Sequence, residues 1–159
     1  LRVAREMGTL TYRSGPEWME RFGRQRPGDE APQLHEDFQV ERYLAYQGDK
    51  FCLQYDPNSY LYISKAMDLF DIADETNASG ASPKGIKAPH LSAIEASALV
   101  IGVKSDILFP VWQQRELAKY LEDAGVAVNY VELDSPYGHD TFLIEVDRVG
   151  DALRTHLEG

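Results

Sequence analysis

The 159-residue sequence contains a single cysteine, Cys52, so the chain cannot form an internal disulfide. One unpaired thiol fits a reducing compartment, and we expect a cytoplasmic protein. No apolar run approaches the roughly 20 residues that a membrane-spanning helix needs, and the N-terminus lacks the apolar core of a secretory signal. The sequence also begins without a methionine, which predicts that the chain was cut out of a longer protein.

Positive charge is also scarce in this sequence. Sixteen lysines and arginines stand against 26 aspartates and glutamates, which gives a net charge of -10. Binding to nucleic acid or to an anionic membrane requires a basic face on the protein, so we expect neither as a partner. The composition is otherwise typical of a soluble globular protein, and the length is sufficient for one domain with a hydrophobic core.

Several signatures of catalytic and binding sites are missing. The sequence has no G-x-S-x-G nucleophile elbow, no S-x-x-K pair, no glycine-rich phosphate loop and no cluster of histidine and cysteine at metal-ligand spacing. We therefore expect no metal and no bound cofactor. Cys52 lies in Lys-Phe-Cys-Leu without flanking glycines, and we predict a packed thiol there rather than a nucleophile.

Helical patterns dominate residues 1–90. Ser14-Gly-Pro-Glu17 resembles a capping box, with a hydroxyl at the N-cap, proline in the first turn and glutamate three residues later. Asp56-Pro57 repeats the pattern of N-cap and proline, and an apolar stripe at helical spacing follows it. Further helices are predicted over 1–10, through Trp18 and Phe22, and over 38–46 with Phe38, Tyr43 and Tyr46 packed, whereas 24–33 and 74–89 have the composition of loops.

Residues 91–159 follow a β-α-β-α pattern. The nearly continuous apolar run that ends at Val103 predicts a strand over 98–103, buried on both faces of a parallel sheet. A helix over 110–124 that stops at Gly125, a strand over 126–133 and a helix over 141–157 with one apolar stripe follow. This order requires a right-handed crossover and a parallel strand pair. Because two strands are too few for a stable sheet, we expect the edge of a larger doubly wound sheet, with residues 1–90 as a helical cap.

An acid and a histidine follow the two predicted strands. Asp106 comes just after the first strand and His139 just after the second, and the carboxyl ends of parallel strands are where functional groups gather. This is the order in which α/β-hydrolases supply the last two members of a Ser…Asp…His triad. The alternative for each residue alone is an acidic turn and a surface histidine. The other histidines lack this context, and we expect His35, His90 and His156 to be solvated or placed near a helix dipole.

Short segments in order along nearly the whole chain carry a family resemblance. They are Ala4-Arg5, Leu10–Ser14 (LTYRS), Arg21–Arg24 (RFGR), Val40–Gly48 (VERYLAYQG), Asn58–Tyr62 (NSYLY), Ser105–Pro110 (SDILFP) and Tyr137–Asp140 (YGHD). Each is weak alone, whereas the ordered set is highly specific. The set resembles the homoserine O-acetyltransferases and their serine O-acyltransferase relatives. Gly8–Tyr12 (GTLTY) and Ser14–Trp18 (SGPEW) resemble the serine-acylating members more.

The resemblance implies a fold and a reaction. The fold would be the C-terminal portion of an α/β-hydrolase, α/β in class, with a helical lid over 1–90 and the last two parallel strands and their helices over 91–159. The family is cytoplasmic and homodimeric, and it serves methionine and cysteine biosynthesis. It transfers an acetyl or succinyl group from acyl-CoA, the co-substrate, to the hydroxyl of L-homoserine or L-serine through an acyl-serine intermediate.

The resemblance also assigns roles to individual residues. Asp106 and His139 correspond to the triad acid and base. Arg5 corresponds to the residue that holds the acceptor carboxylate, and Tyr12, seven residues on and on the same helical face, to its neighbour in the acceptor site. Asp140 corresponds to the anchor of the acceptor ammonium group. The alternatives are a surface residue for Arg5 and a helix N-cap for Asp140, which is compatible with the anchor role.

Two other functions stay open at this point. A plain esterase or other hydrolase of the same fold would use Asp106 and His139 equally well, with water in place of the acceptor. A non-catalytic truncated fragment is the third possibility, because the N-terminal strands, the nucleophile elbow and the oxyanion donors of the family are missing before Leu1. We expect this polypeptide alone to be inactive.

Overall fold

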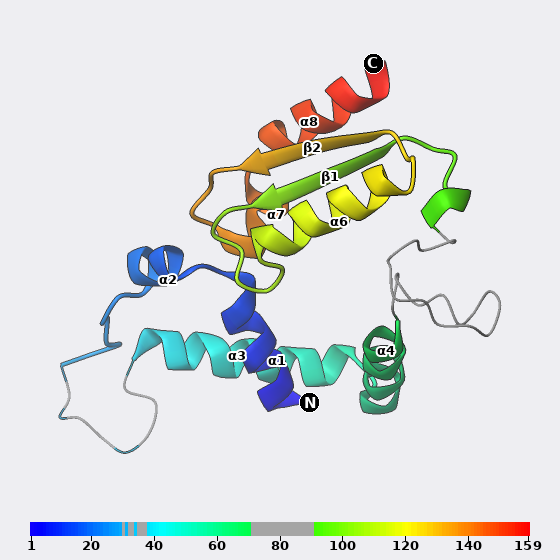
Figure 1. The fold of residues 1–159 in the computed structure, drawn as a ribbon. Coiled ribbons are helices and arrows are strands. Elements are labelled where there is room, and N and C mark those ends of the chain that lie inside the picture. Colours follow the sequence, from blue (N-terminus) through cyan, green and yellow to red (C-terminus); the bar gives the residue numbers. More distant parts are fainter. Residues whose placement is uncertain (30, 32–33, 35–37, 71–90) are drawn as a thin grey trace.

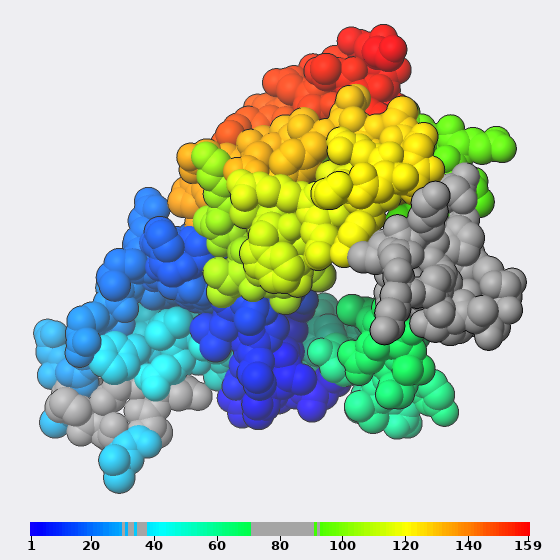
Figure 2. Space-filling view, viewed as in Figure 1, coloured from blue at the N-terminus to red at the C-terminus, as the bar shows by residue number. Residues whose placement is uncertain are grey.

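The computed structural model describes residues 1–29, 31, 34, 38–70 and 91–159. They form a helical part that ends at residue 70 and a sheet part over 91–159, and the two lie against each other (Figure 1). In the space-filling view the N-terminal residues, in blue, lie directly under the segment that follows the first strand (Figure 2). The loop predicted over 74–89, together with His35 and His90, lies outside the described residues.

The helical part contains α1 (Arg2–Tyr12), α2 (Gly15–Arg21), α3 (Gln39–Gln54) and α4 (Pro57–Leu69), and α1 crosses α3 (Figure 1). The prediction of a short helix over 38–46 is wrong in length, because α3 continues for two more turns. Gly48 is the poorest helix former in that continuation, and Phe51 near its end stacks on Tyr55 with 5.1 Å between ring centroids. The prediction of a packed Cys52 is also wrong, since this thiol is exposed on α3.

Aromatic rings join α2 to α3. Trp18 stacks on Phe22 with 5.4 Å between ring centroids, and Phe22 lies 5.1 Å from Tyr43. The predicted packing of Phe38 is confirmed, because its ring is half-buried beside the Arg24 guanidinium. The predicted packing of Tyr46 is wrong, because this side chain is 60% exposed. The aromatic cluster fixes the position of α2, and therefore the turn that precedes it.

The cap predicted at Asp56 is confirmed. Its carboxylate accepts a hydrogen bond from the backbone N–H of Ser59 at 2.7 Å, and this bond holds the pKa of Asp56 below its ordinary value. The apolar stripe that follows faces solvent to a large extent, with Met67 66% and Phe70 74% exposed. Helix α4 therefore forms from local signals, with little burial in this chain.

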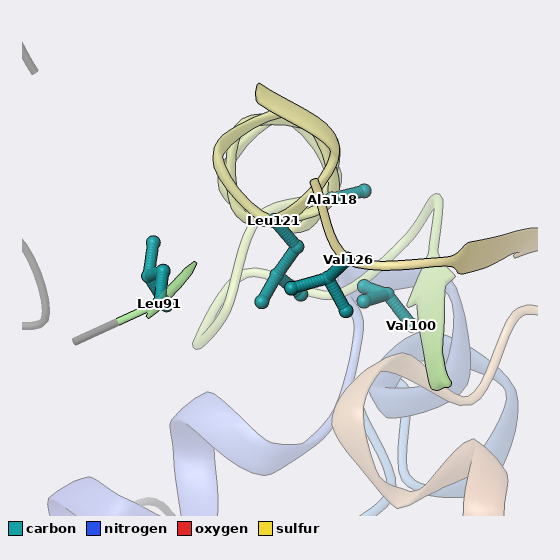
Figure 3. Close-up of a cluster of buried hydrophobic side chains, with 5 residues drawn as sticks. All are labelled: Leu91, Val100, Ala118, Leu121 and Val126. Carbon is teal, nitrogen blue, oxygen red and sulfur yellow. The ribbon is translucent and has the colours of Figure 1, made fainter. Parts of the chain in front are cut away.

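The sheet part is built on two parallel strands, as predicted. Strands β1 (Ala98–Val103) and β2 (Val128–Leu133) pair in register from Ala98 opposite Val128 to Val103 opposite Leu133. Helix α6 (Val111–Asp123) covers one face, and Gly125, two residues past its end, has a φ of 88° that matches the predicted helix stop. The core lies between α6 and this face (Figure 3), and its buried members are Leu91 of the short helix η1 (Leu91–Ala93), Val100, Ala118, Leu121 and Val126.

The second face of the sheet carries the C-terminal helices. The prediction of one helix over 141–157 is wrong, because the backbone of Glu145 (ψ 54°) separates α7 (Thr141–Ile144) from α8 (Val146–Glu158). Neither glycine nor proline marks this break in the sequence. The apolar stripe of α8 is largely uncovered, with Val146 61% and Leu157 81% exposed. Within the described residues, no helix combines the length and apolarity needed to span a bilayer.

Candidate active site

The acid of the site sits at the carboxyl end of β1. Asp106 is buried, and its Oδ1 atom accepts hydrogen bonds from the backbone N–H groups of Leu108 (2.8 Å) and Phe109 (2.9 Å). An aspartate that bonds to the backbone two and three residues ahead closes a local turn, which fixes the carboxylate in one orientation. The Oδ2 atom is left to face the loop after β2.

The histidine meets this acid directly. His139 lies in η2 (Gly138–Asp140), and its Nδ1 atom is 2.8 Å from Oδ2 of Asp106. An ionised carboxylate only accepts hydrogen bonds, so the shared proton belongs to Nδ1, and Nε2 of the neutral ring is left as an acceptor. The imidazole is partly exposed (28%) whereas the Asp106 side chain is buried (6%). The arrangement orients a base toward a partner outside the pair.

An open pocket of about 360 Å³ lies beside the pair. The rings of Phe109 and Phe142 flank His139, with ring centroids at 5.1 Å and 5.5 Å from the imidazole. These rings shield part of the imidazole from water, which strengthens its interaction with the Asp106 carboxylate. The lining residues are Ile101, Val103, Asp106, Phe109, Gln114, Leu133, His139, Phe142 and Val149.

Hydroxyl groups hold the loop that carries the histidine. The Ser105 hydroxyl donates to the carbonyl oxygen of Ser135 (2.5 Å) and accepts from the backbone N–H of Gly138 (3.0 Å). The fully buried Thr141 hydroxyl donates to the carbonyl oxygen of Gly138 at 2.7 Å. The turns after β1 and β2 are thereby joined by hydrogen bonds in addition to the contact between Asp106 and His139.

The helical part contributes the turn between α1 and α2, which we call the α1–α2 corner (residues 12–14). Ser14 caps α2 as predicted by accepting from the backbone N–H of Glu17 (3.2 Å), and its hydroxyl also donates to the carbonyl oxygen of Pro136. The Tyr12 ring lies 6.1 Å from the His139 ring. Gly138 packs so closely on the corner that a Cβ atom there would lie 2.9 Å from the backbone nitrogen of Ser14.

Arg5 lies in a second pocket, of about 310 Å³, which Tyr12 also lines. Its guanidinium carbon is 5.5 Å from the centroid of the Tyr12 ring and 5.1 Å from that of Phe51. The prediction that Arg5 and Tyr12 share one helical face is confirmed. The structure therefore brings Asp106, His139 and Tyr12 together, and it connects Arg5 to this group through the Tyr12 ring.

Asp140 follows His139 and makes an ion pair across to the helical part. Its Oδ2 atom lies 3.6 Å from Nη2 of Arg13. Asp140 occupies the N-cap position of α7, as the alternative predicted, but its side chain makes no capping hydrogen bond there. His156 is engaged elsewhere, 2.9 Å from the Asn129 amide, and within the described part of the chain no group of three potential metal-ligating side chains occurs.

The sequence of this chain is similar to those of several curated proteins. No family model matches the chain. A serine O-succinyltransferase of Emericella nidulans is 40% identical over 215 residues, which cover 99% of this chain and 42% of that protein. A serine O-succinyltransferase of Litchfieldella anticariensis is 47% identical, with 93% and 40% covered. The chain spans about two fifths of the length of the curated relatives it matches.

Solved structures give the same result for the fold. The homoserine O-acetyltransferase of Bacillus anthracis superimposes with a TM-score of 0.79 at 22% identity, over 100% of this chain and 41% of that one. Esterase E22, as an L374D mutant, gives 0.76 at 18% identity over 100% and 42%. The chain is part of an α/β-hydrolase fold. The predicted fold class and the predicted resemblance to the homoserine and serine O-acyltransferases are both confirmed.

Sequence reasoning missed several parts of this candidate site. The two phenylalanines beside His139 and the hydroxyls that hold its loop were not singled out, because an aromatic or a serine in a loop carries no specific signal. Gly138 (φ 61°) did carry one, since a glycine next to a candidate base often marks a left-handed turn. The cap at Ser14 was found, but its bond to Pro136, 122 residues away, has no local signature.

Proposed function

We propose that the protein containing this chain is an O-acyltransferase that moves an acyl group from acyl-CoA to the hydroxyl of L-serine or L-homoserine. The contact of 2.8 Å between Asp106 and His139, with Tyr12 and Asp140 beside it, is the observation that carries the proposal. The names of the relatives support serine as acceptor and succinyl as acyl group, and the fold neighbour supports homoserine and acetyl as the alternative.

The reaction proceeds in two steps through an acyl-serine. A serine hydroxyl from outside these residues gives its proton to Nε2 of His139 and attacks the thioester carbonyl; the C–S bond breaks, and CoA leaves as the thiol with that proton. The acceptor hydroxyl then gives its proton to the same nitrogen and attacks the acyl-serine, whose oxygen leaves and recovers the proton. Asp106 stabilises the imidazolium in both steps.

The acceptor is selected by its charged ends. Asp140 binds the ammonium group beside His139, so that the hydroxyl on the same small molecule reaches Nε2. Arg5 attracts the carboxylate, for which the planar guanidinium is well shaped. The Tyr12 ring lines the Arg5 pocket and lies near both the Arg5 guanidinium and the His139 ring.

The direct test is CoA release by the full-length protein. Succinyl-CoA and acetyl-CoA are each supplied with L-serine, with L-homoserine and without any acceptor. The proposal expects release that depends on an amino-acid acceptor, together with formation of the O-acylated amino acid. Release at the same rate without an acceptor would assign the protein to the hydrolases.

A plain esterase is the second candidate, because esterase E22 shares the fold and because the same acid and base would suffice for ester hydrolysis. Replacing Arg5 separates the two functions. Arg5→Ala in the full-length acyltransferase should raise the acceptor KM about tenfold or more, since a charged hydrogen bond to a carboxylate is worth about 1.5–3 kcal/mol, and leave the acyl-CoA KM unchanged. Arg5→Lys serves as the matched variant that retains the charge. An acceptor KM that stays constant in Arg5→Ala would contradict the assigned role.

A further inference from the structure

One arginine of the α1–α2 corner lies between two carboxylates. Arg13 is paired with Oε1 of Glu17, one turn along α2, and its other nitrogen is 3.6 Å from Oδ2 of Asp140. All three side chains are largely withdrawn from water, with exposed fractions of 15% for Arg13, 8% for Glu17 and 18% for Asp140. One positive charge thus serves two negative charges in a region where screening by water is weak.

Glu17 is the unusual member of this trio. Its second oxygen, Oε2, is buried and has no hydrogen-bond partner within the described residues. A buried carboxylate oxygen without a partner costs free energy, so an ionised side chain at this position depends on the Arg13 guanidinium beside it. The predicted reason for an acid at this position was a capping box, but the Glu17 side chain is turned to Arg13 instead. Its negative charge therefore calls for a different account.

The charge of Glu17 decides how Arg13 acts on Asp140. With Glu17 ionised, the trio has a net charge of -1, and Arg13 is shared. With a neutral residue at position 17, Arg13 would pair with Asp140 alone and cancel its charge. The Asp140 carboxylate directly follows His139, and the α1–α2 corner is packed on the same turn through Ser14 and Gly138. The charges of Glu17 and Arg13 therefore affect the electrostatic potential at the candidate acceptor site.

We propose that Glu17 is a positioning residue that engages Arg13 and so keeps the Asp140 carboxylate available to the ammonium group of the acceptor. This inference rests on the proposed function, in which Asp140 anchors that group. Glu17 itself is buried and does not touch the acceptor. Its effect is on the preference for an acceptor that carries an ammonium group, whereas formation of the acyl-serine precedes acceptor binding and does not need it.

The test compares two acceptors in the full-length protein. L-serine and 3-hydroxypropanoate carry the same hydroxyl and carboxylate, but only L-serine has the ammonium group. Glu17→Gln should lower the ratio of their kcat/KM values about tenfold, which lies within the range of coupling measured between residues of one salt-bridge network. The loss should come from a higher KM for L-serine, with kcat and the acyl-CoA KM unchanged. Where L-homoserine is the better acceptor, 4-hydroxybutanoate is its matched analogue.

Two further variants make the result specific to charge. Glu20→Gln removes the same charge from an exposed position one turn along α2 and should leave the acceptor ratio unchanged. Glu17→Asp retains the charge and should recover most of the preference for the ammonium group. Equal ratios in Glu17→Gln and Glu20→Gln would overturn the inference, as would a loss in Glu17→Asp as large as that in Glu17→Gln. If the unsubstituted protein releases CoA without any acceptor, the proposed function fails instead, and that outcome is recognised before any variant is made.

Discussion

Replacing His139 with alanine in the full-length protein should lower kcat about 10⁴-fold or more, as the loss of the base does in triads of this type. His139 is held by the 2.8 Å contact with Asp106 and lies between two phenylalanine rings, which cannot accept a proton in its place. The measurement is CoA release at saturating acyl-CoA and acceptor. His156→Ala is the matched control and should retain full kcat, because His156 faces Asn129 near the other end of the sheet.

A substitution of Asp106 tests the same catalytic pair in a second way. Asp106→Asn keeps the size of the side chain but removes the charge that stabilises the imidazolium, and it favours the wrong tautomer of His139. A loss of about 10³–10⁴-fold in kcat is expected, with the acceptor KM little changed. If both His139→Ala and Asp106→Asn stay within tenfold of the unsubstituted protein, this pair has no catalytic role and the proposed mechanism is wrong.

The strands and the acid–base pair were predictable because their signals are local. Six consecutive residues from Ala98 to Val103 suffice to mark a strand, although only Val100 and Gly102 are buried rather than both faces as predicted, and the order of elements then forces a parallel pair. Once the pair is parallel, the residues after both strands must emerge at one edge of the sheet. Asp106 and His139 could therefore be brought together without any knowledge of the remaining chain.

The uncovered apolar surfaces were not predictable by the same reasoning. The stripes of α4 and α8 have the helical period expected of packed faces, yet Met67 and Leu157 are mostly exposed. A period in the sequence states which side of a helix is apolar, but it does not state what covers that side. The chain matches only about two fifths of each curated relative, so the sequence of these residues carries no information on such a cover.

The α1–α2 corner shows why the supporting residues of the site were missed. Arg13 lies more than a hundred residues before Asp140 in the sequence, and the ion pair between them depends on how the helical part is placed on the sheet part. A capping box correctly marked Ser14, since capping is decided within one turn. The second bond of that hydroxyl, to Pro136, arises only in the tertiary structure.

Gly138 is where the packing of the corner is tightest, and Gly138→Ala should have the second-largest effect. The left-handed backbone (φ 61°) costs an L-residue with a Cβ about 1–2 kcal/mol, and overpacking adds about 1–3 kcal/mol. The atoms that a Cβ would meet, at 2.9 to 3.1 Å, all belong to the backbone of residues 12–14, so no side-chain rotation relieves the contact. The corner and the turn that carries His139 must therefore move apart.

This displacement should lower the catalytic rate as well as the stability of the protein. A shift of about 1 Å in a catalytic group can reduce the rate about 100-fold, and His139 is the next residue along the chain. We expect Gly138→Ala to lower both the melting temperature and kcat of the full-length protein. Gly150→Ala on α8, where a Cβ would meet nothing within 4 Å, is the matched control and should change neither unfavourably. If the two variants have equal kcat and equal melting temperatures, the α1–α2 corner does not hold the histidine in place, and the turn is supported by Ser105 and Thr141 alone.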